Sequence, residues 1–406
     1  MPQIIISIDG LCARFTGAYG SSWVPTPTLD SLAARSILFD NFFVESVDPV
    51  ANFRSLLEGR HALLCQKGSP GPDGNGWQTA LRDAVLVTDD LALAGSLSGS
   101  FRKIILSEPS ADQAPAEQTA FDCLFQTAIN AIRSPESAGG SPVWIHSKGM
   151  YSEWDAPPEL QELFKGDGDP PPLEVNGIPN LELLPDHDPD ERLGFVHAYA
   201  AQVVDLDQSL AGFLHELAKQ QQDTGPPLSI AFLGLRGFPL GEHLEIGFPE
   251  STCHAQSFHV PLFFYHPDLP APVRCSQMLS SSHWLDAVEY QQKATTGRET
   301  VAFGNDPRRL LLMANSRFCR LQTRSWSLIQ GVTWSPLGSS DSTPPNSRPQ
   351  LFVQPSDRME INEVSDRCPE VTAELSDELR RQVEIFAEGK QPQPASLSDS
   401  VFQGIT

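Results

Sequence analysis

Two acidic features of the chain have the residue types that bind metal ions. Asp9 follows the apolar run IIISI and so stands at the end of a predicted strand, where open α/β sheets place their ligand sites. Asp9 is either a metal ligand or a carboxylate that caps a turn or pairs with a cation. The run PDHDPDE at 185–191 spaces carboxylates as a calcium loop does, but it lacks the Gly and terminal Glu of an EF-hand. A solvated acidic turn is therefore the favoured interpretation of 185–191.

Several histidines could also take part in chemistry. Glu242 and His243, with His254 and His259 downstream, would form a metal site if their loops converged. Scattered histidines are more often loop or capping residues, and the sequence leaves both interpretations open. His146 follows an apolar strand, where it is either a hydrogen-bond donor in a pocket or a hydrogen-bonded core histidine.

Strands and helices that alternate along the chain must position these residues. Apolar, β-branched and aromatic runs with little polar alternation indicate strands buried on both faces, as in a mainly parallel sheet covered by helices. These runs lie at 4–9, 84–89, 143–147, 228–235 and 260–265. The segment 199–217 repeats its apolar residues at three- and four-residue spacing, which predicts an amphipathic helix. The sequence thus predicts an α/β fold with a mixed, mainly parallel sheet between helices.

The pattern of predicted elements changes near residue 308. Two strand-like runs lie within 308–334, a third lies at 351–353, and 372–389 has the pattern of a helix. We therefore predict an α/β domain over 1–300, a small subdomain with an antiparallel sheet and a helix over 301–390, and a flexible tail over 391–406.

Charge and cysteine content exclude several classes of protein. The chain has 28 Lys and Arg against 51 Asp and Glu, a net charge of −23, which disfavours nucleic acid and anionic membranes as partners. Its seven cysteines are scattered without a CxxC pair, as expected of reduced thiols in a cytoplasm. Neither a signal peptide nor an apolar run long enough to span a bilayer is evident. We expect an acidic, cytoplasmic protein without a membrane partner.

A series of motifs along the chain resembles the sulfatases, a branch of the alkaline phosphatase superfamily. The resemblance begins with a strand ending in Asp9 and continues in the same order as in that family to the end of the chain. The matching segments are GAYG at 17–20, TPTLDSLAARSILFDNFF at 26–43, LLEGR at 56–60, WDAPPE at 154–159, YAAQVVDLDQSLAGFLHEL at 199–217, FLGLRGFPLGEH at 232–243, HVPLFFYHPD at 259–268, LQTRSWSLI at 321–329 and LFVQPSDRMEINEVSDRCPE at 351–370.

The resemblance implies a particular chemistry at the carboxyl ends of the strands. Sulfatases hold a divalent cation with hard oxygen ligands, surround the sulfate with Lys and His, and use a Cys or Ser oxidised to formylglycine as nucleophile. Counted back from LLEGR, the nucleophile position falls on Pro49, which cannot be oxidised in this way. The family's first aspartate pair becomes Asp9 and Gly10, so that one ligand of the pair has no side chain here.

The remaining positions of the implied site are also altered. The family's second metal pair aligns with Leu235 and Arg236, an apolar side chain and a permanent cation. The aligned Lys and His positions around the sulfate are occupied by Asp89, Leu91, Tyr151 and Glu250, so that two cations have become acids. Arg236 could occupy the former cation position and pair with Asp9, or it could point into solvent.

These replacements lead to two hypotheses about function. The first is a sulfatase-like pseudoenzyme that has lost its nucleophile and most metal ligands and serves as a binding or regulatory protein. It would need no cofactor, and its partner would be a small molecule or a protein, such as an active sulfatase. The alternative is a hydrolase of sulfuric or phosphoric esters with a rearranged site that holds calcium or magnesium.

Overall fold

The structure is a computed structural model that describes residues 3–66, 81–108, 118–134, 141–169, 171–175, 177–224, 228–248, 253–296, 308–331, 348–393 and 397–403. The predicted site position Glu250 lies outside these residues. None of the helices that the structure describes has both the length and the apolar composition needed to cross a membrane.

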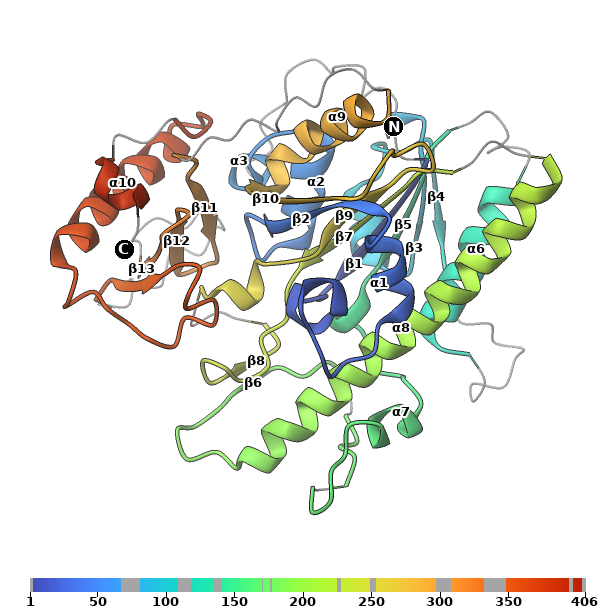
Figure 1. The fold of residues 1–406 in the computed structure, drawn as a ribbon, viewed down its shortest axis with the longest axis horizontal. Coiled ribbons are helices and arrows are strands. Elements are labelled where there is room, and N and C mark those ends of the chain that lie inside the picture. The colour runs from blue at the N-terminus through green and yellow to red at the C-terminus, as the bar shows by residue number, and fades with distance from the viewer. Residues whose placement is uncertain are drawn as a thin grey trace.

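An eight-stranded sheet forms the centre of the molecule (Figure 1). Strand β9 is antiparallel to its neighbours β7 and β2, and every other pair is parallel. From one edge to the other, the strands are β10 (Val273–Ser280), β2 (Ser36–Phe43), β9 (Leu262–Tyr265), β7 (Ile230–Arg236), β1 (Ile4–Asp9), β5 (Val143–Ser147), β3 (Val85–Thr88) and β4 (Lys103–Leu106). The predicted mixed, mainly parallel sheet is confirmed, and all five predicted runs contain a strand.

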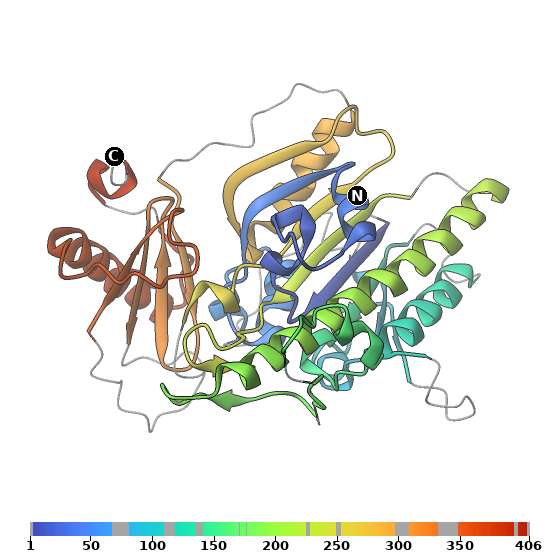
Figure 2. The same cartoon turned by 60° about the horizontal axis from the view of Figure 1, so that its bottom comes forward.

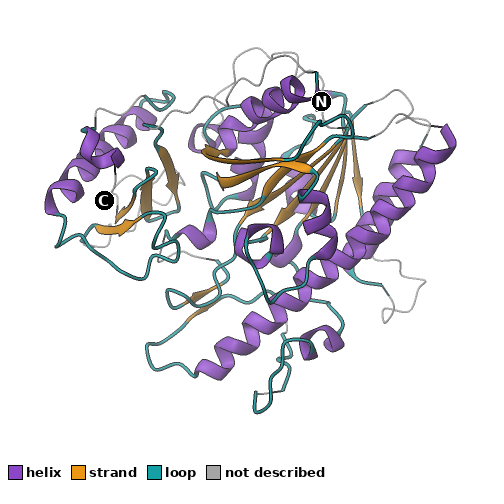
Figure 3. Ribbon diagram, in the orientation of Figure 1, coloured by secondary structure: helices purple, strands orange, loops and turns teal. Residues whose placement is uncertain are grey.

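Helices cover both faces of this sheet (Figure 3). Ile4, Ile6 and Ile8 of β1 belong to one core cluster and Ile5 to another, because successive side chains of a strand point to opposite faces. The first cluster includes residues of α1 (Pro27–Ala33), α6 (Ala120–Arg133) and α8 (Pro189–Thr224). The second includes residues of α2 (Pro49–Glu58), α5 (Leu91–Ser96) and α9 (Trp284–Thr295). The long helix α8 contains the predicted amphipathic segment.

A second, antiparallel sheet of four strands lies beside the main sheet (Figure 2). Its strands are β11 (Leu311–Ala314), β12 (Phe318–Gln322), β13 (Trp326–Gly331) and β14 (Gln350–Val353), and α10 (Pro369–Ala387) packs on it. The sequence predicted one strand fewer. The side chain of Asn315 accepts hydrogen bonds from the backbone N–H groups of Arg317 and Phe318, which turns the chain within the first predicted run.

The small sheet shares core packing with the main domain. Leu311, Met313 and Phe352 belong to the same cluster as residues of α2 and α9, and the backbone N–H of Ala314 donates to the carbonyl of Glu45 at 3.1 Å. In the segment predicted as a tail, Leu397 and Val401 are buried. Shorter elements complete the fold: η1 (Ala13–Phe15), η2 (Gly17–Tyr19), α3 (Ala62–Gln66), η3 (Gly149–Tyr151), α7 (Pro158–Glu162), β6 (Leu181–Glu182), β8 (Glu245–Ile246), η4 (Ala255–Ser257), η5 (Ser281–His283) and α11 (Asp399–Gln403).

Candidate functional site

The carboxyl ends of β1 and β7 bring Asp9 and Arg236 into direct contact. Asp9 ends β1, Arg236 ends β7, and the two residues are paired in the sheet. Nε of Arg236 lies 2.8 Å from Oδ1 and 3.0 Å from Oδ2 of Asp9, and Nη2 lies 2.9 Å from Oδ2. The side chain of Arg236 is 10% exposed and that of Asp9 is 1% exposed. Of the two alternatives for Arg236, pairing with Asp9 or pointing into solvent, the structure shows the pairing, and both carboxylate oxygens of Asp9 accept from the guanidinium.

The rest of the Arg236 guanidinium is also enclosed. Nη1 donates to the carbonyl of Val47 at 2.9 Å, and the ring of Tyr151 lies 3.5 Å from the guanidinium carbon. The Tyr151 hydroxyl donates to the carbonyl of Gly237 at 3.0 Å, which holds the ring in place. Burial lowers the pKa of Arg236, but the charge of Asp9, the hydrogen bonds that it accepts from the guanidinium and the smaller effects of Tyr151 and Asp48 together raise the pKa above its ordinary value. The guanidinium is therefore a fixed cation.

Pro49, at the predicted nucleophile position, is the first residue of helix α2. Asp48 caps this helix by accepting a hydrogen bond from the backbone N–H of Val50 at 2.9 Å, and proline is well suited to the first helical position. Asn52, one turn further, is fully buried and donates to the carbonyls of Ser46 and Leu235. These contacts fix the start of α2 against the end of β7, with a capping carboxylate beside Pro49.

Gly10 has two structural reasons to lack a side chain. Its φ is +77°, a conformation that residues with a Cβ adopt at a cost, and a Cβ added to it would lie 2.7 Å from Cβ of Met150. A carboxylate at this position would collide with the segment that carries Tyr151. The space beside Asp9 is therefore filled by Met150.

The other predicted site positions have ordinary structural surroundings. Asp89 accepts hydrogen bonds from the Ser147 hydroxyl at 2.8 Å and the Lys148 backbone N–H at 2.6 Å, which ties the end of β3 to the end of β5. Burial raises the pKa of Asp89 to about 6. Leu91 is 71% exposed in the first turn of α5, and Leu235 is fully buried in the core.

The rings of His243 and His254 stack with their centroids 3.4 Å apart. Nδ1 of His254 lies 3.1 Å from the Glu360 carboxylate, and Nε2 of His243 donates to the carbonyl of Met359 at 2.9 Å. Both histidines are thus tied to the loop after β14. They contribute to the junction of the two sheets.

The remaining residues of the proposed histidine site lie in separate interactions. Glu242 forms an ion pair with Arg14, and His259 donates through Nε2 to the carbonyl of Asp40 at 2.8 Å. His146 has Nδ1 at 2.9 Å from the Ser7 hydroxyl, inside the core, as a hydrogen-bonded core histidine would.

The acidic run 185–191 leads into helix α8. Asp188 accepts from the backbone N–H of Asp190 at 3.0 Å, and His187 lies 3.3 Å from Glu191. Asp190 and Glu191 occupy the first turn of the helix, where negative charge is favourable. The run forms an acidic helix start.

The sequence carries no match to a model of a protein family or to a protein with a curated description. Solved structures match along the whole chain. A protein solved in complex with its substrate D-glucosamine-2-N,6-O-disulfate has a TM-score of 0.67 at 15% identity, covering 98% of this chain and 100% of that chain. This is the sulfatase fold. A 2-O GAG sulfatase has a TM-score of 0.64 at 13% identity, covering 100% of both chains. The phosphonate monoester hydrolase of Silicibacter pomeroyi has a TM-score of 0.67 at 15% identity, covering 98% of this chain and 97% of that one.

The sulfatase fold raises the question of whether a divalent cation fits at Asp9. Both oxygens of Asp9 already accept hydrogen bonds from Arg236. A divalent cation placed there would be repelled by the positive guanidinium, which its packing holds in position. Over the part of the chain that the structure describes, no three His, Cys, Asp or Glu side chains gather closely enough to hold a metal ion. The residues at this edge of the sheet do not fit a divalent cation.

Sequence reasoning missed the residues that enclose the Arg236 guanidinium and an arginine-lined pocket elsewhere. The Val47 carbonyl is a backbone group and leaves no signature in the sequence. Tyr151 was noted only because it replaces a histidine of the sulfatases, and that replacement does not predict a contact with Arg236. The pocket, described below, joins segments that are far apart in the sequence.

Proposed function

We propose that this chain is a non-catalytic relative of the sulfatases that serves as a binding or regulatory protein. The observation that carries the proposal is the contact of Arg236 with both carboxylate oxygens of Asp9. A guanidinium in that position provides a permanent positive charge without an exchangeable coordination site. The salt bridge between Arg236 and Asp9 thereby replaces a metal ion as the link between the strand ends.

Two further features support this proposal. Pro49 has no side-chain group that could attack sulfur or phosphorus, and the capping carboxylate of Asp48 stands beside it. Asp89 has a pKa raised to about 6 by burial, so that it is mainly an anion at pH 7 and would repel an anionic ester. Both features disfavour sulfuryl or phosphoryl transfer at this edge of the sheet.

The partner in this role is a small molecule or another protein, and an active sulfatase relative is one such protein. We place the protein in the cytoplasm, because all seven of its cysteines are free thiols. This placement and the partner are both part of the proposal.

The test is metal analysis of the purified full-length chain together with assays on aryl sulfate, aryl phosphate and aryl phosphonate esters. Each assay is run with and without calcium, magnesium or manganese. We expect substoichiometric metal and no turnover above that of the Asp9→Ala variant. Stoichiometric metal together with turnover that Asp9→Ala abolishes would overturn the proposal in favour of an ester hydrolase with a rearranged site.

Asp9→Ala leaves Arg236 unpaired and can unfold the chain, so a second measurement is needed. The thermal unfolding midpoint of the wild-type protein is recorded as each metal ion is added. A metal ion that binds the folded state raises this midpoint, whereas we expect no change. A rise at micromolar metal would count against the proposal without the use of any variant.

A further inference from the structure

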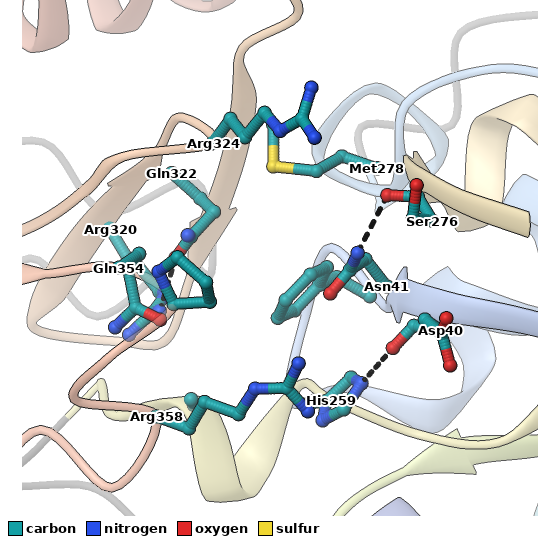
Figure 4. A pocket seen from close by; sticks show the side chains of 13 residues that line it. Asp40, Asn41, His259, Ser276, Met278, Arg320, Gln322, Arg324, Gln354 and Arg358 are labelled. Carbon is teal, nitrogen blue, oxygen red and sulfur yellow. Dashed lines mark hydrogen bonds between the residues drawn. The ribbon is translucent and has the colours of Figure 1, made fainter. Parts of the chain in front are cut away.

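A pocket of about 180 Å³ lies at the junction of the two sheets, away from the contact of Asp9 with Arg236 (Figure 4). The main sheet supplies one wall through β2 and β10, and Ala255 of η4 together with His259 closes one side. The subdomain supplies the other wall through β12 and the segments after β12 and β14. The lining residues are Asp40, Asn41, Phe43, Ala255, His259, Ser276, Met278, Arg320, Gln322, Arg324, Gln354, Pro355 and Arg358.

The pocket has an excess of positive charge. Arg320 is buried and lies against Glu360, and Asp40 forms an ion pair with Arg274 at 2.7 Å, so these charges are compensated. Arg324 and Arg358 are exposed, and neither forms an ion pair with a carboxylate among the described residues. Figure 4 shows their side chains above and below the pocket, with Asn41 on the facing wall.

The positive charge of the pocket contrasts with the negative net charge of the whole chain. With a net charge of −23 there is ample carboxylate to pair with surface arginines, yet two guanidinium groups that pair with no carboxylate of the described residues line one pocket. Burial together with the charges of Arg358 and Arg320 lowers the pKa of His259 to about 4. His259 is therefore neutral at pH 7, and the arginines alone supply the positive charge.

The remaining surface of the pocket offers packing and hydrogen bonds. Phe43, Met278 and Pro355 present apolar atoms, and the amides of Gln322 and Gln354 lie on the subdomain wall. The amide of Asn41 is held by its hydrogen bond to the carbonyl of Ser276 at 2.7 Å. A few oriented polar groups on an apolar lining are typical of a small-molecule site.

We propose that this pocket binds a small organic oxyanion, whose charged group is held by one of the two arginines, Arg324 or Arg358, and whose body packs on Phe43 and Met278. Guanidinium groups bind carboxylate, sulfate and phosphate oxygens with paired N–H donors, so these three anionic groups share the required chemistry. Because each wall belongs to a different sheet, the ligand would bridge the main domain and the subdomain. The pocket shares no residue with the site of the proposed function, and the inference holds whether or not that site is catalytic.

The test is isothermal titration of the full-length chain with phenyl phosphate, phenyl sulfate and benzoate, with phenol and inorganic phosphate as comparisons. We expect at least one of the organic anions to bind at submillimolar concentration and phenol not to bind. We expect inorganic phosphate to bind at least tenfold more weakly than phenyl phosphate, because it lacks the apolar body. The tightest of the three organic probes identifies the anionic group.

Variants then assign the binding to this pocket. Arg324→Gln or Arg358→Gln should weaken binding at least tenfold, which identifies the arginine that holds the anion, and the double variant should abolish binding. Arg133→Gln is the matched control, because Arg133 is also a surface arginine but pairs with Glu216 outside the pocket. It should leave the affinity unchanged. Far-UV circular dichroism confirms that the variants are folded.

Three results would overturn the inference. The first is no binding of any organic anion by the wild-type chain at 10 mM. The second is binding that the double variant retains, and the third is equal binding of inorganic phosphate and phenyl phosphate, which would show that the apolar lining is not used.

Discussion

Arg236 ends a strand of the main sheet, whereas Arg324 and Arg358 lie in loops of the subdomain, and the two places differ in what neutralises the arginine charge. Arg236 is enclosed by Asp9, the Val47 carbonyl and the Tyr151 ring, so that its charge is satisfied within the chain. Arg324 and Arg358 face a pocket with no ion pair to a described carboxylate. An enclosed, paired arginine holds the fold together, whereas an open, unpaired one is available to a ligand. The predictions below test this distinction, beginning with the largest effect.

Arg236→Met should destabilise the folded chain by about 3–5 kcal/mol, because it leaves the buried Asp9 carboxylate without its partner. Adding Asp9→Asn removes the second charge and should restore part of the lost stability. Urea unfolding measured at pH 7 gives these free energies. Arg133→Met, at an exposed ion pair, is the control and should change stability by less than about 1 kcal/mol. Equal effects of Arg236→Met and Arg133→Met would refute a structural role for the enclosed pair.

Glu360 should make stability depend on pH. Its burial would raise the pKa, but Arg320 and His254 outweigh burial and lower the pKa from 4.5 to about 2. A depressed pKa stabilises the fold above pH 4.5, and this contribution is lost as the pH falls toward 2. Glu360→Gln should therefore lose on the order of 3 kcal/mol at pH 7, and more than half of this difference should disappear by pH 3. If the free energies of unfolding of wild type and Glu360→Gln differed by the same amount at pH 7 and pH 3, Glu360 would not be a source of pH-dependent stability.

Gly10 and Gly20 allow the crowding beside Asp9 to be separated from backbone strain. Both have positive φ, but a Cβ on Gly20 would meet open space whereas one on Gly10 would meet Met150. Gly20→Ala should destabilise by about 1 kcal/mol. Gly10→Ala should destabilise by a further 1–3 kcal/mol or so, because it adds overpacking to the same strain. Chemical denaturation compares the two variants directly, and equal losses would mean that the space at Gly10 can relax.

Arg324→Gln and Arg358→Gln should have the smallest effect on stability. Both side chains are exposed and without a described ion pair, so each substitution should change the free energy of unfolding by less than about 0.5 kcal/mol. The unfolding curve of the ligand-free protein provides the measurement. A loss above about 2 kcal/mol in either variant would place these arginines in the same structural class as Arg236.

The sequence predicted the main sheet, and it offered the pairing of Asp9 with Arg236 as one of two alternatives, each for a physical reason. Continuous apolar runs such as 143–147 have few other places in a globular protein, and a carboxylate and a guanidinium at adjacent strand ends neutralise each other. The arginine pocket was not predicted because Arg324 and Arg358 lie in separate loops whose approach depends on how the two sheets pack. One strand of the subdomain was missed, because the turn at Asn315 that divides the first predicted run into β11 and β12 depends on side-chain hydrogen bonds.

The position of β1 in the sheet has a consequence for how the chain is made. Both neighbours of β1 come late: β5 begins at Val143 and β7 ends at Arg236. Arg236 follows Asp9 by 227 positions, and this length of chain takes about 11 to 45 seconds to synthesise at about 5–20 residues per second. During this time the apolar segment Ile4–Asp9 has been synthesised, but β7, the strand that completes its pairing, has not. The nascent chain therefore has a long interval in which a chaperone could bind its first strand.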